Sequence, residues 1–245
     1  MIRIIILFGL WSVVTASQGA NVRVASAANF YPTLNKIKQL FEESTEHKVT
    51  IIRGSTGKLY AQIINGAPYD VFLSADSDRA EKLVVKGKAY DGKALVYAVG
   101  QLSVWKPGAN NVQQIRDKLS SGNISKLAIA NPKTAPYGKA AIESLKSMGL
   151  YEQLKNKLVY GENISQTLQF VQSGAAELGF VARSHMRNRV DKAEYWNIST
   201  DQHKPIQQKM LLLKNAKNIN AAQAFVNYMQ IPYIKKLIQN DGYQL

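Results

Sequence analysis

The hydrophobic pattern within residues 22–41 (VRVASAANFYPTLNKIKQLF) first alternates and then becomes helical. From Phe30 to Phe41, apolar residues recur every three or four positions, as on the buried face of a helix. Asn29 is a favoured N-cap, and Pro32 falls in the first turn, where a missing amide hydrogen costs little. The pattern predicts a strand, a turn and a helix beginning near Asn29. Free amides at such a junction favour negative ions.

The same strand-turn-helix unit recurs along the chain. A strand at 49–52, the turn GSTG and a helix at 59–64 precede a strand at 71–73. Further predicted strands are 127–130, 158–160 and 178–181, and they alternate with helices that start near Gly138 and after Asn163 and end at Gly149 and Gly174. Alternating strands and helices predict parallel α/β sheets, in which ligands bind beyond the carboxyl ends of the strands.

Two further apolar segments leave the domain organisation open. Residues 94–105 form an unusually long strand pattern, and a matching segment begins at Ile206. Either both are ordinary sheet strands, or both cross between two lobes. In the second case the helices predicted at 220–230 and 233–240 return to pack on the first lobe, and each lobe presents two helix starts to one cleft.

The first twenty residues (MIRIIILFGLWSVVTASQGA) contain one positive charge at Arg3, an apolar run from Ile4 to Val14, and then small and polar residues. This order is typical of a secretory signal peptide, with a buried strand or a membrane anchor as the alternative. The remaining chain of about 225 residues is long enough for two lobes of roughly 100 residues each. Because the chain has no cysteine, it has no disulfide or thiolate ligand. We expect export to the periplasm of a Gram-negative cell.

The chain is strongly basic, with 31 Lys and Arg against 17 Asp and Glu and a formal net charge of +14. The lysines are spread through most segments, and no run of five or more like charges marks a basic tail. This balance fits a solvated surface, long-range attraction of small anions, or nucleic-acid binding. Charge alone does not choose among the three.

The turns carry no catalytic or metal-binding pattern. They contain no carboxylates paired for acid–base catalysis and no G-x-S-x-G motif, and His47, His185 and His203 are isolated in the sequence. The string GSTGK at 54–58 is not a nucleotide-binding loop, because the required earlier glycine and following Ser or Thr are missing. Neutral amides and hydroxyls remain, and these can hold a deprotonated oxyanion. We therefore expect no enzyme activity, cofactor or bound metal cation.

Four strings, VASAANF, GSTGKLYAQIINGAPYDVFLSAD, NPKTAPYGKAAIESL and ELGFVA, resemble in order and spacing the periplasmic molybdate-binding proteins of ABC importers. The resemblance covers essentially the whole mature chain, and the second string is its most specific part. It implies an α/β, two-lobe periplasmic binding protein fold of type II. In that fold each lobe is a mainly parallel sheet flanked by helices, and two crossing strands join the lobes. The implied organisation is a signal peptide at 1–20, lobe 1 at 21–101 and 207–245, and lobe 2 at 102–206.

The resemblance also implies partners and contacts. The partners would be molybdate or tungstate and an inner-membrane permease, with no nucleic acid, and the protein would be a monomer. The oxyanion contacts would fall on Ala28 and Asn29 in the first junction, Ser55 and Thr56 in the second, Tyr137 in the third and Ile164 in the fourth, the last two chiefly through backbone amides. Asn29 and Ala182 differ from one branch of the family, which has serine and tyrosine there. The branch with ANF and GFVA is more similar.

Each candidate residue also has a purely structural interpretation. Asn29 would then cap its helix, Ser55 and Thr56 would shape a turn, Tyr137 would pack its ring, and Ile164 would serve an apolar face.

Charged residues near the junctions have two interpretations as well. Arg53 and Lys58 either aid capture of an anion or are simply solvated. Asp70 and Asp76 are expected to hold loops, because a carboxylate facing a dianion would repel it.

Other functions stay open. The same fold can serve sulfate, phosphate or an organic anion. Phosphate often keeps a proton at neutral pH and benefits from an acceptor carboxylate, for which Glu162 is the only acid close to a junction. A basic polyanion-binding protein is the more distant alternative, and it predicts affinity that falls steeply with salt.

Overall fold

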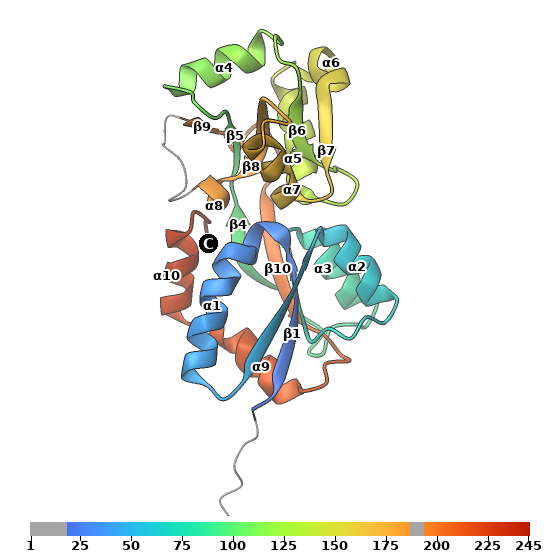
Figure 1. Cartoon of the computed structure of the whole chain (residues 1–245). Helices are drawn as coiled ribbons and strands as arrows, with labels where there is room; N and C mark the ends of the chain where they lie inside the picture. Colours follow the sequence, from blue (N-terminus) through green and yellow to red (C-terminus); the bar gives the residue numbers. More distant parts are fainter. Residues whose placement is uncertain (1–18, 187–193) are drawn as a thin grey trace, which may run out of the picture.

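The computed structural model describes residues 19–186 and 194–245. They form two mixed sheets flanked by helices, one sheet in each of two lobes (Figure 1). The predicted two-lobe α/β fold is therefore confirmed. Residues 1–18, which make up most of the predicted signal peptide, lie outside the described residues. In the described part of the chain, no helix is both long enough and apolar enough to cross a membrane.

The first sheet has the strand order β2-β1-β3-β10-β4. Its strands are β1 (Asn21–Ala27), β2 (Lys48–Gly54), β3 (Val71–Ser74), β4 (Leu95–Gly100) and β10 (Ile206–Leu212). β1 pairs in parallel with β2 and β3, whereas β10 runs antiparallel to β3 and β4. The sheet is thus parallel over three strands and antiparallel where the chain leaves the lobe and returns.

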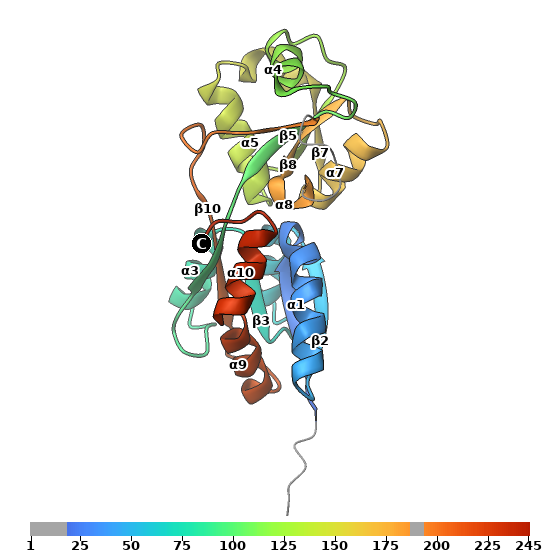
Figure 2. The same cartoon turned by 90° about the vertical axis from the view of Figure 1, so that its left-hand side faces the viewer.

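Helices cover both faces of this sheet (Figure 2). One layer consists of α1 (Tyr31–Ser44), α9 (Ile219–Tyr228) and α10 (Pro232–Asn240), and the other of α2 (Thr56–Ile64) and α3 (Ser77–Val85). In the first layer, the ring of Phe41 packs edge-on against Phe225 at 5.2 Å between centroids. The C-terminal helices therefore pack on the lobe that begins with β1.

The second sheet has the order β7-β6-β8-β5-β9. Its strands are β5 (Leu102–Trp105), β6 (Leu127–Ala130), β7 (Leu158–Gly161), β8 (Leu178–Ala182) and β9 (Tyr195–Asn197). β6 is parallel to β7 and β8, and β5 is antiparallel to β8 and β9. The flanking helices are α4 (Val112–Ser120), α5 (Pro136–Ser147), α6 (Tyr151–Leu154), α7 (Ile164–Gln172) and α8 (Arg183–Met186), with a short 3-10 turn, η2 (Lys155–Lys157).

The long strand predicted over residues 94–105 is two strands that belong to different sheets. β4 ends at Gly100, Gln101 intervenes, and β5 begins in the other lobe. The chain returns to the first sheet through β10, so two crossing segments join the lobes (Figures 1 and 2). The residue boundaries given above for the two lobes stay a prediction.

Strand register brings the predicted junctions together within each lobe. Ala27 at the end of β1 pairs with Gly54 at the end of β2, and Ala130 in β6 pairs with Gly161 in β7. Because these strands are parallel, the turns that follow them lie at the same edge of the sheet.

Candidate functional site

A small cavity lies where the four junctions meet. Its lining residues are Ala27, Ala28, Asn29, Gly54, Ser55, Thr56, Ala75, Ala135, Pro136, Tyr137, Asn163 and Ile164. The structure thus places all six predicted site residues around one space. About 10 Å³ is open to the centre of a water-sized sphere, roughly what one water molecule requires. The lobes are therefore close together around room for one small guest.

The first junction corrects the prediction for Asn29. Ala28 and Asn29 lie in a 3-10 turn, η1 (Ala28–Phe30), and α1 begins at Tyr31 without a side-chain cap. The Nδ2 atom of Asn29 instead donates hydrogen bonds to Gln208 Oε1 at 2.9 Å and Tyr243 Oη at 3.2 Å. The capping role was wrong because distant polar partners compete for this side chain.

The second junction presents two buried hydroxyls. Ser55 occupies the N-cap position of α2, yet its side chain makes no capping bond. Among the residues that the structure describes, Ser55 Oγ has no hydrogen-bond partner, although the residue is only 3% exposed. Thr56 Oγ1 accepts a hydrogen bond from the Ala75 amide at 3.1 Å, which leaves its proton free to be donated elsewhere. An unpartnered buried hydroxyl is costly unless a ligand satisfies it.

The third and fourth junctions present helix starts from the other lobe. Helix α5 begins at Pro136, two residues before the predicted start, because proline suits the first helical position. Tyr137 is therefore the second residue of α5. Ile164 is the first residue of α7, and the predicted Asn163 cap is confirmed by its bonds from the Ser165 and Gln166 amides. First-turn amides have no intrahelical acceptor, so those of Tyr137 and Ile164 are available to an anion.

The acids near the junctions are engaged elsewhere. Asp70 accepts hydrogen bonds from the amides of Arg23 at 2.7 Å and Lys217 at 2.8 Å, and so ties its own loop to strand β1 and to the loop at Lys217. Asp76 caps α3 and pairs with Arg79. No acidic residue is among the described residues that line the small cavity. The site is therefore built from neutral donors.

Direct contacts hold the two lobes together around the cavity. The Gly57 amide donates to the Thr134 carbonyl at 2.9 Å, and Ser165 Oγ donates to the Ala28 carbonyl at 3.2 Å. Small side chains permit this approach: Ala27, Ala28 and Ala75 of the first lobe pack within the apolar cluster of the second. The described arrangement is thus a closed one.

An exposed ion pair also spans the cleft and supplies a first test. Lys58 Nζ lies 2.9 Å from Glu162 Oε1, with the side chains 53% and 47% exposed. Exposed pairs contribute about 0–1 kcal/mol. We therefore expect Glu162→Gln to change anion affinity in calorimetry by less than about fivefold.

Glu152→Gln is the matched control, because Glu152 forms a similar exposed pair with Lys155 in the second lobe. A large, selective loss of phosphate binding in Glu162→Gln alone would instead make Glu162 an acceptor for a protonated ligand.

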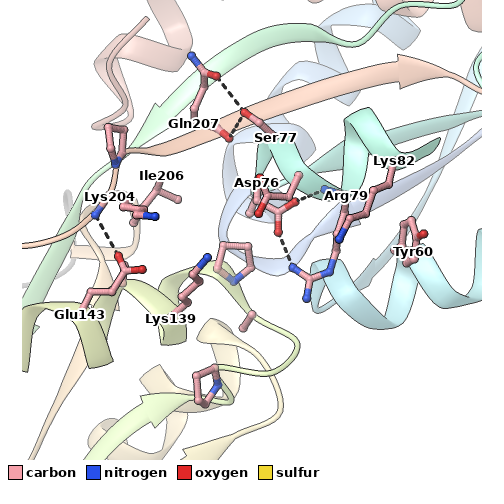
Figure 3. Close-up of a pocket in the computed structure, with 17 residues that line it drawn as sticks. Tyr60, Asp76, Ser77, Arg79, Lys82, Lys139, Glu143, Lys204, Ile206 and Gln207 are labelled. Carbon is pink, nitrogen blue, oxygen red and sulfur yellow. Dashed lines mark hydrogen bonds and ion pairs between the residues drawn. The ribbon is translucent and has the colours of Figure 1, made fainter. Parts of the chain in front are cut away.

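A larger cavity of about 330 Å³ adjoins the small one and shares three lining residues with it. Figure 3 shows Arg79 and Lys82 on α3 opposite Lys139 and Glu143 on α5. Arg79 is held by Asp76 and donates to the Lys133 carbonyl across the cleft at 3.0 Å. The interlobe cleft therefore continues past the small cavity into a polar space, which the sequence did not predict.

A buried polar layer lies behind Asn29. Gln208 is fully buried, and its Oε1 accepts hydrogen bonds from Asn29 and from Tyr97 Oη at 2.9 Å. Burial, with a contribution from neighbouring Tyr243, raises the pKa values of Tyr97 and Tyr137 well above that of a free tyrosine. These phenols stay protonated at neutral pH and place no negative charge beside the cavity.

Sequence reasoning missed Gln208 and Tyr243. They lie 179 and 214 positions from Asn29, and no local pattern links such distant residues.

The histidines, which are isolated in the sequence, belong to no cluster of metal ligands in the described chain. Across residues 19–186 and 194–245, no three His, Asp or Glu side chains come together as metal ligands. His47 accepts a hydrogen bond from the Ala20 amide, and His203 Nδ1 lies 2.8 Å from the Lys204 carbonyl oxygen. What the site offers is hydrogen-bond donors for a small anion.

Two α/β lobes, two crossing segments and a cavity between helix starts of both lobes define a solute-binding protein of the periplasmic type. The chain belongs to the family of bacterial extracellular solute-binding proteins, whose family model matches residues 22–244.

Three named proteins are similar to this chain over most of its length. The chain is 42% identical to the molybdate-binding protein ModA of Azotobacter vinelandii, over 99% of this chain and 97% of that protein. It is 40% identical to ModA of Rhodobacter capsulatus, over 91% of this chain and 87% of that protein. The solved Azotobacter vinelandii periplasmic molybdate-binding protein has a TM-score of 0.85 at 35% identity, covering 91% of this chain and 99% of that one. All three are named as binding proteins, and none as an enzyme.

Proposed function

We propose that this protein is an extracytoplasmic receptor, not an enzyme, that captures molybdate between its lobes and delivers it to an ABC permease. The observation that carries the proposal is the unpartnered Ser55 hydroxyl, buried in a cavity lined by neutral residues. The similarity to two proteins named for molybdate binding, at 42% and 40% identity, supports this ligand.

In this proposal, the donors come from all four junctions. Ala28, Asn29, Tyr137 and Ile164 contribute backbone amides, and Ser55 and Thr56 contribute hydroxyls. The Asn29 side chain is already bonded to Gln208 and Tyr243, and its carbonyl accepts from Tyr243 Oη at 2.8 Å, which leaves its backbone amide for the anion. Each charge-assisted bond contributes about 1.5–3 kcal/mol. Several such bonds, together with the positive ends of the helix dipoles, can hold a dianion without an opposing formal charge.

The site favours a fully deprotonated ligand over phosphate. A protonated oxyanion needs an acceptor, yet Glu162 is paired with Lys58 at the rim, and the described cavity lining has no carboxylate. We propose that tungstate binds as well, since it presents the same charge and nearly the same size. Sulfate and organic anions are the remaining alternatives.

Thermal melting with single anions tests the choice of ligand. A ligand at 100 times its Kd adds about 2.7 kcal/mol of stability. We expect molybdate and tungstate to raise the melting temperature strongly, and phosphate to leave it unchanged. A shift with sulfate alone would reassign the receptor. A shift with none of these anions would contradict oxyanion capture.

We also propose where the protein works and in what form. Residues 1–20 would direct export to the periplasm and then be removed, and the mature receptor would act as a monomer. The solved relative from Azotobacter vinelandii is a periplasmic protein by name, which supports this location. Light scattering of the mature protein, with and without molybdate, checks the oligomeric state.

A further inference from the structure

Tyr137 connects the small cavity to the crossing strands. Tyr137 lies in the first turn of α5 and lines the cavity, and its hydroxyl reaches the strands that join the lobes. There, Gln208 Nε2 donates a hydrogen bond to Tyr137 Oη at 3.5 Å. One residue of the second lobe thus contacts both the ligand space and the hinge.

Gly100, the last residue of β4, leaves room for this hydroxyl. A Cβ atom on Gly100 would lie 2.2 Å from Tyr137 Oη, 2.8 Å from Gln208 Nε2 and 2.9 Å from Tyr137 Cζ. The backbone of Gly100 is not in the left-handed region, so its conformation does not demand glycine. The missing side chain is therefore needed for space, and the phenol packs directly on the crossing strand.

Gln208 fixes the other side of the same contact. It lies on β10, where the pairing with β4 shifts register between Gln208 and Lys209. Its Oε1 is occupied by Asn29 and Tyr97, so its Nε2 points to Tyr137. Because Asn29 also lines the cavity, Gln208 links the first junction to the third through buried hydrogen bonds.

We propose that Gly100 and Gln208 form a seat for the Tyr137 phenol that sets how far the lobes close, and so positions the Tyr137 amide against the anion. Gly100 and Gln208 are thus positioning residues, since neither lines the small cavity. The proposal rests on the proposed function and adds the part of the fold that controls closure. Closure about crossing strands is a hinge motion. A small displacement of side chains at the hinge therefore becomes a larger displacement of the two lobes at the cleft.

A double-mutant cycle tests the seat with Gly100→Ala, Tyr137→Phe and their combination. Calorimetry with molybdate should show affinity reduced about tenfold or more in Gly100→Ala, because its Cβ displaces the phenol and the α5 amide with it. Tyr137→Phe removes the shortest of the three contacts and leaves those with the ring and Gln208, so it should shrink the cost of Gly100→Ala by about threefold without abolishing it, which is the signature of direct coupling. Val96→Ala on β4 is the control, with affinity close to that of the wild type, because Val96 is 46% exposed and lines neither of the two interlobe cavities.

Spin labels give a direct readout of closure. The chain has no native cysteine, so labels attach only at cysteines introduced at Val85, which is 86% exposed in the first lobe, and Tyr160, 50% exposed in the second. With saturating molybdate, we expect a longer distance in Gly100→Ala than in the otherwise unchanged protein. A loss of packing alone would not change this distance.

The outcomes separate this proposal from the proposed function. Equal costs of Gly100→Ala in both backgrounds, or an unchanged closed distance, would overturn the seat. No response of the wild type to molybdate would overturn the ligand instead. In that case the double-mutant cycle is measured on the melting temperatures of the ligand-free proteins. The clash between Gly100→Ala and the Tyr137 hydroxyl predicts non-additive shifts of these temperatures, and additive shifts would contradict the seat.

Discussion

Ser55→Ala is expected to weaken molybdate binding by about 10- to 150-fold, the equivalent of one charge-assisted hydrogen bond of 1.5–3 kcal/mol. The Ser55 hydroxyl is buried at 3% exposure and has no partner within the described chain, so its only stabilising role is toward a ligand. Titration calorimetry measures the loss directly.

The same substitution should not lower the melting temperature of the ligand-free protein, because removing an unpartnered buried hydroxyl removes a desolvation cost. Ser144→Ala is the matched control. Ser144 is also fully buried, but its hydroxyl already bonds to the Ala140 carbonyl at 2.9 Å within α5. Its loss should leave molybdate affinity unchanged. Wild-type affinity in Ser55→Ala would remove Ser55 from the site.

Ile164→Pro should reduce molybdate affinity by a similar factor, because it deletes a single backbone hydrogen-bond donor. Ile164 is the first residue of α7, where proline is tolerated, and Asn163 before it already has the extended backbone that a following proline requires. The helix should therefore form, while the amide that we propose to face the anion is gone. We expect affinity to fall about 10- to 150-fold in calorimetry.

Ile164→Val separates the amide from the side chain. It keeps the N–H and most of the apolar contact, so its affinity should stay near that of the wild type. Circular dichroism of both variants checks that α7 persists. Equal affinities in the proline and valine variants would mean that the fourth junction does not contact the anion.

Local patterns predicted most of the site, because its residues lie where strands end and helices begin. Asn163 caps α7 and proline starts α5 through interactions within a few residues, and hydrophobic spacing reveals such starts. The family resemblance then selected the six residues that line the small cavity.

The failures of the sequence reasoning share one cause, which is competition from distant partners. Asparagine is favoured at helix N-caps, but the side chain of Asn29 bonds to Gln208 and Tyr243 instead. Residues 94–105 read as one strand because hydrophobicity does not reveal that Gly100 and Leu102 belong to different sheets. The seat of Tyr137 depends on the bond between Asn29 and Gln208 and on the end of β4 at Gly100. Neither can be predicted from local sequence patterns.

The alanines at the interlobe contact also bear on how cargo is given up. Ala27, Ala28 and Ala75 expose little apolar area when the halves separate, since a methyl group contributes only about 0.8 kcal/mol on burial. Apolar contact between the lobes therefore contributes little to keeping the ligand-free protein closed. Closure then depends on the few hydrogen bonds between the lobes and on the bound anion, so a permease that draws the anion away leaves only those hydrogen bonds to be broken before the lobes reopen.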